Sequence, residues 1–243
     1  MTEPAKAFVS VARATLLGTA TAAFLAACGA ETSQGELSMK IFEVAKDASK
    51  DLKPKGDGTS DKKDGQGAAN PNVIVAKALK ATPGPVALVV RLDTKAVLAM
   101  NPVGRNAGYV TWGSATGQGL TFRNGVLANT RGLGEDLMSS RIDRAVSAIT
   151  SRGNASYRRE HVYLDGVGES QSLIVNCTLR RTKTERVALG AINADAAIMK
   201  ESCLGDEVVF DNLYWVDGRG RILKSSQWVS QEIGNLAIQN LRL

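Results

Sequence analysis

Four consecutive residues near the start of the chain, Leu25-Ala26-Ala27-Cys28, have the types and spacing that acylation of a cysteine requires. Small residues before the cysteine let an extended peptide enter a narrow peptidase cleft, and the Cys28 thiol is the atom that would carry diacylglycerol. The segment before it has a basic start and an apolar run over 14–24. That run is too short to span a bilayer of about 30 Å and is typical of an export signal. The sequence predicts a signal peptide over 1–27 and lipidation at Cys28; the alternative is a secretory signal with an accidental cysteine.

Lipidation would place the chain in the cell envelope. Attached fatty acids such as palmitate contribute about 0.8 kcal/mol per buried methylene, so several chains give a stable membrane anchor. Gly29 stands where an Asp would favour retention at the inner membrane, so we expect the periplasmic face of the outer membrane. Removal of 1–27 lowers the net charge from +6 to about +5. No dense Lys/Arg patch is present, so the sequence does not predict nucleic-acid binding.

Two further cysteines, Cys177 and Cys203, remain after acylation of Cys28. In an oxidising compartment they most simply form one disulfide, which would stabilise the fold by roughly 3 kcal/mol in the chain-entropy model. Cys177 alternates in phase with apolar residues of a predicted strand, so its sulfur is expected on the inward face. Cys203 is expected in a loop that enters the next strand. The single histidine and scattered carboxylates lack metal-ligand spacing, so no metal site or other cofactor is predicted.

The residue types of an enzyme are sparse. His161 is the single histidine, and a catalytic triad would need it beside a Gly-x-Ser-x-Gly elbow, which the sequence lacks. We expect a surface or rim histidine. Carboxylates cluster in sequence at Glu201, Asp206, Glu207, Asp211 and Asp217. A pair about 5–10 Å apart can cleave a glycosidic bond, but spacing in sequence does not create such a pair. No catalytic residue is assigned.

Three tryptophans stand out in a chain that is only 5% aromatic: Trp112, Trp215 and Trp228. Exposed indoles could form a platform for sugar rings, which makes these three the candidate glycan contacts. The alternative is that they lie in the core or line a barrel. The alternating face that Trp215 shares with Leu213 favours the core for that residue.

Hydrophobic patterning divides the chain into three parts. Residues 28–84 are expected to hold the lipidated tether, one or two short helices and a flexible Lys/Gly-rich linker over 53–70. Residues 85–243 show repeated short strand patterns separated by turn dipeptides, including Asn124-Gly125, which is typical of a type I′ hairpin. A short helix is predicted near 136–150. We therefore expect a mainly β domain, an antiparallel meander curled into a barrel or half-barrel.

Within 85–242, a series of motifs resembles the YjbF/GfcB family of capsule and exopolysaccharide lipoproteins. The motifs are Thr111-Trp112, Gly125, Thr130-Arg131-Gly132-Leu133 with Asp136-Leu137, Tyr163, Cys177, Glu201-Ser202-Cys203, 210–217 (FDNLYWVD) and Ser226-Gln227-Trp228.

The resemblance implies a β-rich lipoprotein that works with the machinery exporting a surface polysaccharide. It brings no catalytic residues. The leading hypothesis is a non-enzymatic accessory protein that is anchored in the membrane and docks to other envelope proteins. The alternatives are a protein that binds or modifies the glycan, and a carrier whose curled sheet holds an acyl chain.

Overall fold

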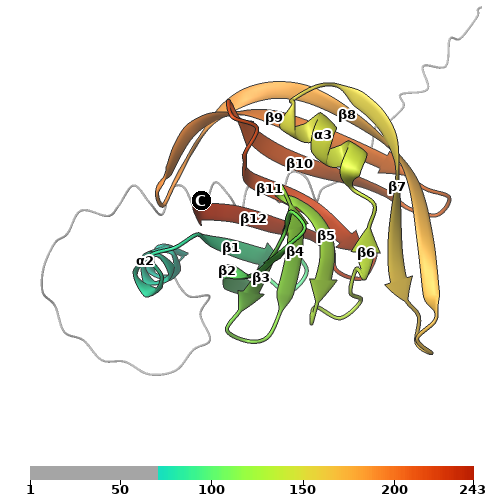
Figure 1. Ribbon diagram of the computed structural model, residues 1–243, viewed down its shortest axis with the longest axis horizontal. Coiled ribbons are helices and arrows are strands. Elements are labelled where there is room, and N and C mark those ends of the chain that lie inside the picture. Colours follow the sequence, from blue (N-terminus) through green and yellow to red (C-terminus); the bar gives the residue numbers. More distant parts are fainter. Residues whose placement is uncertain (1–70) are drawn as a thin grey trace, which may run out of the picture. The chain divides into compact units, whose positions relative to one another are not determined.

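The computed structural model describes residues 71–243, most of which belong to a single antiparallel β-sheet (Figure 1). The strands are β1 Val86–Arg91, β2 Val97–Asn106, β3 Tyr109–Ser114, β4 Gly119–Arg123, β5 Val126–Arg131, β6 Ser139–Ser140, β7 Ala155–Leu164, β8 Ser170–Leu189, β9 Ile192–Leu204, β10 Val209–Asp217, β11 Ile222–Ser230 and β12 Gly234–Arg242. Two helices, α2 Pro71–Ala81 and α3 Asp143–Thr150, accompany them. The sheet curls into a nearly closed barrel, which confirms the predicted fold class.

The strand order, β5-β4-β3-β2-β1-β12-β11-β10-β9-β8-β7-β6, joins two meanders at the β1–β12 pair. The last strand of the chain therefore lies in the middle of the sheet, and β5 and β6 are its edges. The main-chain N–H of Thr130 donates to the carbonyl oxygen of Leu137, 2.8 Å away, just before β6 begins. This contact brings the two edges together and nearly closes the barrel.

The β4–β5 hairpin has the predicted turn. Asn124 and Gly125 have φ values of 48° and 84°, the positive angles that a type I′ turn needs at both central positions. A Cβ atom at position 125 would lie 2.9 Å from the Cβ of Ile222 at the start of β11. Glycine therefore serves both the turn and the close packing of this hairpin against β11.

Both faces of the sheet are packed in places. The main core lies in the barrel interior, and α3 adds Ala145, Val146 and Ile149 to it. A second core on the outer face includes Trp215 and Leu223. A third lies between α2 and the outer face of β1 and β12, next to the tip of the β8–β9 hairpin. The two long strands β8 and β9 arch beside the rest of the sheet (Figure 1).

Several element boundaries differ from the sequence prediction. The residue pattern over 185–192 by itself predicts one strand, whereas the structure divides this stretch between the end of β8 and the turn into β9. Cys203 lies within β9 rather than in a strand-entry loop, so that prediction was wrong. The helix predicted near 136–150 begins only at Asp143.

The N-terminal predictions fall mostly outside the described residues. The signal peptide over 1–27, the tether, the first helix and the linker over 53–70 all lie there, whereas the second short helix is α2. Within 71–243 no helix combines the length and apolar character needed to cross a membrane.

Candidate functional site

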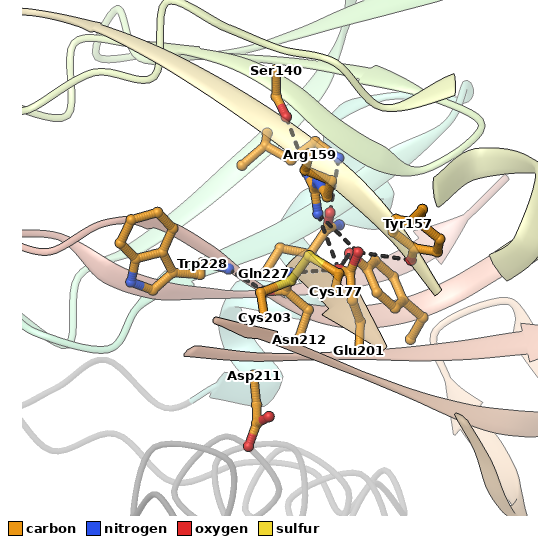
Figure 2. A network of polar contacts seen from close by, with 12 residues as sticks. Ser140, Tyr157, Arg159, Cys177, Glu201, Cys203, Asp211, Asn212, Gln227 and Trp228 are labelled. Carbon is orange, nitrogen blue, oxygen red and sulfur yellow. Dashed lines mark hydrogen bonds and ion pairs between the residues drawn. A yellow bond between two sulfur atoms is a disulfide. The ribbon is translucent and has the colours of Figure 1, made fainter. Parts of the chain in front are cut away.

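Glu201 is the centre of a polar network inside the barrel (Figure 2). Its side chain is fully buried. Its carboxylate accepts hydrogen bonds from the hydroxyls of Tyr157 (2.8 Å) and Tyr214 (2.9 Å). It also accepts from the Asn212 amide (2.7 Å) and pairs with the Arg159 guanidinium (3.0 Å). The alternation of β7, β9 and β10 aims these five side chains inward, and the carboxylate is fully satisfied by protein groups.

The charges in this network stabilise one another. Burial opposes the positive charge of Arg159, but the attraction of Glu201 exceeds it and raises the pKa of the guanidinium. Burial, together with the nearby negative charge of Glu201, raises the pKa values of the Tyr157 and Tyr214 hydroxyls. Both phenols therefore remain protonated donors. Removing one member of such a buried pair leaves an uncompensated charge and costs about 3–5 kcal/mol.

The predicted disulfide is present beside this network. The sulfur atoms of Cys177 and Cys203 are 2.04 Å apart, and the two residues lie directly opposite each other on β8 and β9. Cys177 lies on the inward face, as predicted. A carboxylate oxygen of Glu201 and the two sulfurs lie within 4.8 Å of one another. Because the sulfurs are bonded to each other and the carboxylate is hydrogen-bonded, this group is not arranged as a thiolate metal site.

His161 is buried, with 1% of its surface exposed, so the expectation of a surface or rim residue was wrong. Its ring lies edge-on to Phe210 and Trp228, with centroids 6.0 and 5.9 Å away. Burial, and then the positive charge of Arg159, lower the pKa of the imidazole well below its ordinary value. Neither ring nitrogen has a hydrogen-bond partner among residues 71–243. The ring is a neutral core group here, with no carboxylate orienting it as a base.

The carboxylates that cluster in sequence are separated by the fold. Asp211 lies on the outer face, where it accepts from Ser202 (2.6 Å) and pairs with Lys200 (3.1 Å). Figure 2 shows it pointing away from Glu201. Asp217 accepts the main-chain N–H groups of Arg219 and Arg221 and so caps the β10–β11 turn. Asp206 and Glu207 lie in the turn between β9 and β10. Alternation and turn geometry thus give Glu201, Asp211 and Asp217 three different structural tasks.

The tryptophans do not form one platform. Trp215 is fully buried on the outer face, where the ammonium of Lys224 lies 4.2 Å from the ring centroid. Trp228 is buried in the interior and stacks on Phe210 with centroids 4.2 Å apart. Trp215 and Trp228 therefore lie in the core, which was the alternative to a glycan platform. Trp112 is half-buried and lines a cavity, and its contact with a glycan stays a prediction.

That cavity, with a volume of about 800 Å³, is lined by the interior face of β1–β4, β11 and β12. Arginines from the end of β2 and from the β10–β11 turn stand among its lining residues: Arg105, Arg219 and Arg221. Sequence reasoning missed this site. Arg219-Gly220-Arg221 was a local signal, but only the fold brings it to Arg105.

Sequence reasoning also missed the role of Gln227 within its Ser-Gln-Trp motif. The Gln227 amide accepts from the N–H of Leu127 (2.8 Å) and donates to the carbonyl oxygen of Gly125 (2.9 Å). It thereby satisfies one main-chain donor and one acceptor on the hairpin that includes edge strand β5. A motif residue therefore helps to hold the barrel closed.

Other motif residues also form hydrogen bonds to main-chain groups. Asp136 accepts from the hydroxyl of Thr130 and from the N–H groups of Gly132 and Leu133. The Tyr163 hydroxyl donates to the carbonyl oxygen of Val229, 2.6 Å away. Asp136 and Tyr163 thus bond main-chain groups that support the barrel.

Comparisons with known proteins agree with this architecture. A family model described as group 4 capsule polysaccharide lipoprotein GfcB, YjbF, matches residues 35–241. A search of curated proteins found no match. Among solved structures, the hypothetical lipoprotein YmcC from Escherichia coli (K12) is similar, with a TM-score of 0.61 and 14% identity. The similarity covers 71% of this chain and 90% of that chain, and at this identity it shows the fold alone. Because the family model covers most of the sequence, the chain belongs to the YjbF family of group 4 capsule polysaccharide lipoproteins.

Proposed function

We propose that this chain is a non-enzymatic lipoprotein of the outer membrane, facing the periplasm, that assists the export or assembly of a capsule or exopolysaccharide. It does so by docking to other envelope proteins of the export machinery. The family match over 35–241 is the observation that carries the proposal. The acylation motif Leu25-Ala26-Ala27-Cys28 agrees with the proposal.

The proposal of a non-enzymatic protein is supported by the structural roles of the residues that could act as general acids or bases. A general acid or base must reach a proton of its substrate. Glu201 is buried and bonded to four protein side chains, whereas Asp217 caps a turn and Asp211 holds a surface lysine. His161 is buried among aromatic rings. Each of these groups thus has a structural role that explains its position.

The test measures surface polysaccharide in cells whose chromosomal copy is deleted or carries Asp211→Asn or Asp217→Asn. We expect deletion to reduce the polysaccharide and each substitution to leave it near the wild-type amount, with protein abundance checked by immunoblot. An enzyme would behave differently, because removal of a general acid or base typically costs 10²–10⁴-fold in rate. A normally abundant, folded variant that loses the polysaccharide would overturn the proposal. Glu201 is left out of this comparison because its substitution should destabilise the fold.

Docking has its own test. Crosslinking in intact cells, followed by mass spectrometry, should join this chain to a protein of the polysaccharide-export machinery. The same crosslink should disappear from a strain that lacks that protein. Crosslinks confined to abundant unrelated envelope proteins would contradict docking.

A further inference from the structure

The cavity at the end of the barrel has an apolar interior wall. Val89, Met100, Phe122 and Ile238 contribute aliphatic and aromatic surface from β1, β2, β4 and β12. The half-buried indole of Trp112 completes this side. A volume of about 800 Å³ lies within the range of about 300–1,000 Å³ that is usual for small-molecule sites. These walls favour a ligand with an apolar part.

The turns around the cavity carry positive charge. Arg105, near the end of β2, and Arg219, from the β10–β11 turn, are exposed and have no ion-pair partner within the described part of the chain. Arg221 is paired with Asp217 at 2.8 Å. None of the residues that line the cavity is an Asp or a Glu. Charge complementarity therefore favours an anionic group at this position.

Several polar lining groups are already bonded to protein. The Asn240 amide donates to the carbonyl oxygen of Ile222, and the Thr150 hydroxyl donates to that of Val146. The Ser225 hydroxyl accepts from Gln227. Sugar hydroxyls placed against the apolar wall would lose bonds to water without gaining enough partners, which costs free energy. The lining therefore suits an apolar chain better than a sugar ring.

We propose that this cavity binds an anionic amphiphile, with its apolar tail against Met100, Trp112 and Phe122 and its head group at Arg105 and Arg219. A carboxylate and a phosphate share the chemistry that arginine recognises, so a fatty acid and an alkyl phosphate are both candidates. This site is independent of the proposed function in polysaccharide export. Disproof of either proposal would leave the other unaffected.

The experiment uses the full chain with Cys28→Ser, purified without detergent, and a brominated fatty acid that quenches nearby indoles. Titration with 9,10-dibromostearate, kept below its aggregation concentration, should quench tryptophan fluorescence in a saturable manner. Trp112→Phe should remove most of this quenching. Trp215→Phe should keep it, because Trp215 lies on the opposite face of the sheet.

A pair of arginine variants tests the head-group site. Arg105→Gln with Arg219→Gln should weaken binding by about tenfold, since two charge-assisted contacts are lost. The matched control, Arg158→Gln with Arg180→Gln, removes the same charge from exposed positions that do not line the cavity, and it should bind normally. Palmitate and hexadecyl phosphate compared as competitors identify the preferred head group, and uncharged hexadecanol should compete much less well.

The proposal is overturned if quenching is not saturable, if quenching persists in Trp112→Phe, or if the two arginine-pair variants bind equally well. It is also overturned if trigalacturonate displaces the brominated acid, because that result would assign the cavity to an acidic glycan instead.

Discussion

Replacement of Glu201 by glutamine tests the buried network most sharply. The substitution keeps the size of the side chain but removes its charge, so the guanidinium of Arg159, whose side chain is 4% exposed, loses its counter-ion. Four donor groups point at the two carboxylate oxygens. The new NH₂ group would face some of these donors. Breaking a buried ion pair costs about 3–5 kcal/mol.

In a domain of this size 1 kcal/mol shifts the Tm by roughly 2–4 °C, so Glu201→Gln should lower the Tm by about 10 °C. Thermal unfolding of the oxidised protein, followed by circular dichroism, measures it. The matched control is Asp211→Asn, which removes an acid from a partly exposed pair with Lys200 and should cost less than about 1 kcal/mol.

A double-mutant cycle isolates the pair itself. Arg159→Met should cost much less in the Glu201→Gln background than in the wild type, because the buried charge is then already uncompensated. If Glu201→Gln unfolds within a degree or two of the wild type, the network does not stabilise the fold and our reasoning about it is refuted.

Three other perturbations have defined outcomes. Replacing Cys177 and Cys203 together by alanine should destabilise the domain by about 2–5 kcal/mol in chemical denaturation, and non-reducing peptide maps that show free thiols in the native protein would contradict the bridge. The pKa of His161 is lower in the folded than in the unfolded chain, so its contribution to stability is present above about pH 6.5 and is lost as the pH falls below that value. His161→Phe should therefore flatten the pH dependence of the free energy of unfolding in that range. An unchanged pH profile would refute this assignment. Gln227→Leu removes the bonds to Leu127 and Gly125 and should cost about 1–3 kcal/mol, with faster amide exchange at Leu127; unchanged exchange would show that this contact is dispensable.

The predicted parts of the fold rest on local rules. Asn124-Gly125 specifies its turn because both residues tolerate positive φ. The alternation around Cys177 gave the correct face because one side of β8 is buried there. These features depend on neighbouring residues alone.

The sequence pattern predicts no strand over 193–204, where most of β9 lies, because this stretch begins Asn-Ala-Asp-Ala-Ala, a composition with weak β propensity. Pairing with β8 on one side and β10 on the other overrides that preference. Once β9 is known, the alternation of Met199, Glu201 and Cys203 places all three inside the barrel. Arg159, the ion-pair partner of Glu201, comes from β7, which is two strands away from β9. No local sequence pattern links these two residues.

The cavity could not be predicted for the same reason. Arg105 and Arg219 are 114 positions apart in the sequence and lie in different meanders, which are adjacent in the strand order at the β1–β12 pair. Their common position is a consequence of the closed sheet.

The most direct test of an anchored capsule lipoprotein is the behaviour of Cys28→Ser in cells that make the polysaccharide. Cells are labelled with a clickable fatty acid, and surface polysaccharide is measured in the same cultures beside a deletion strain. We predict that the variant carries no label and that its polysaccharide falls toward the deletion level, although the protein is still made. Equal label and equal polysaccharide in wild type and variant would contradict both the anchor and its role in function.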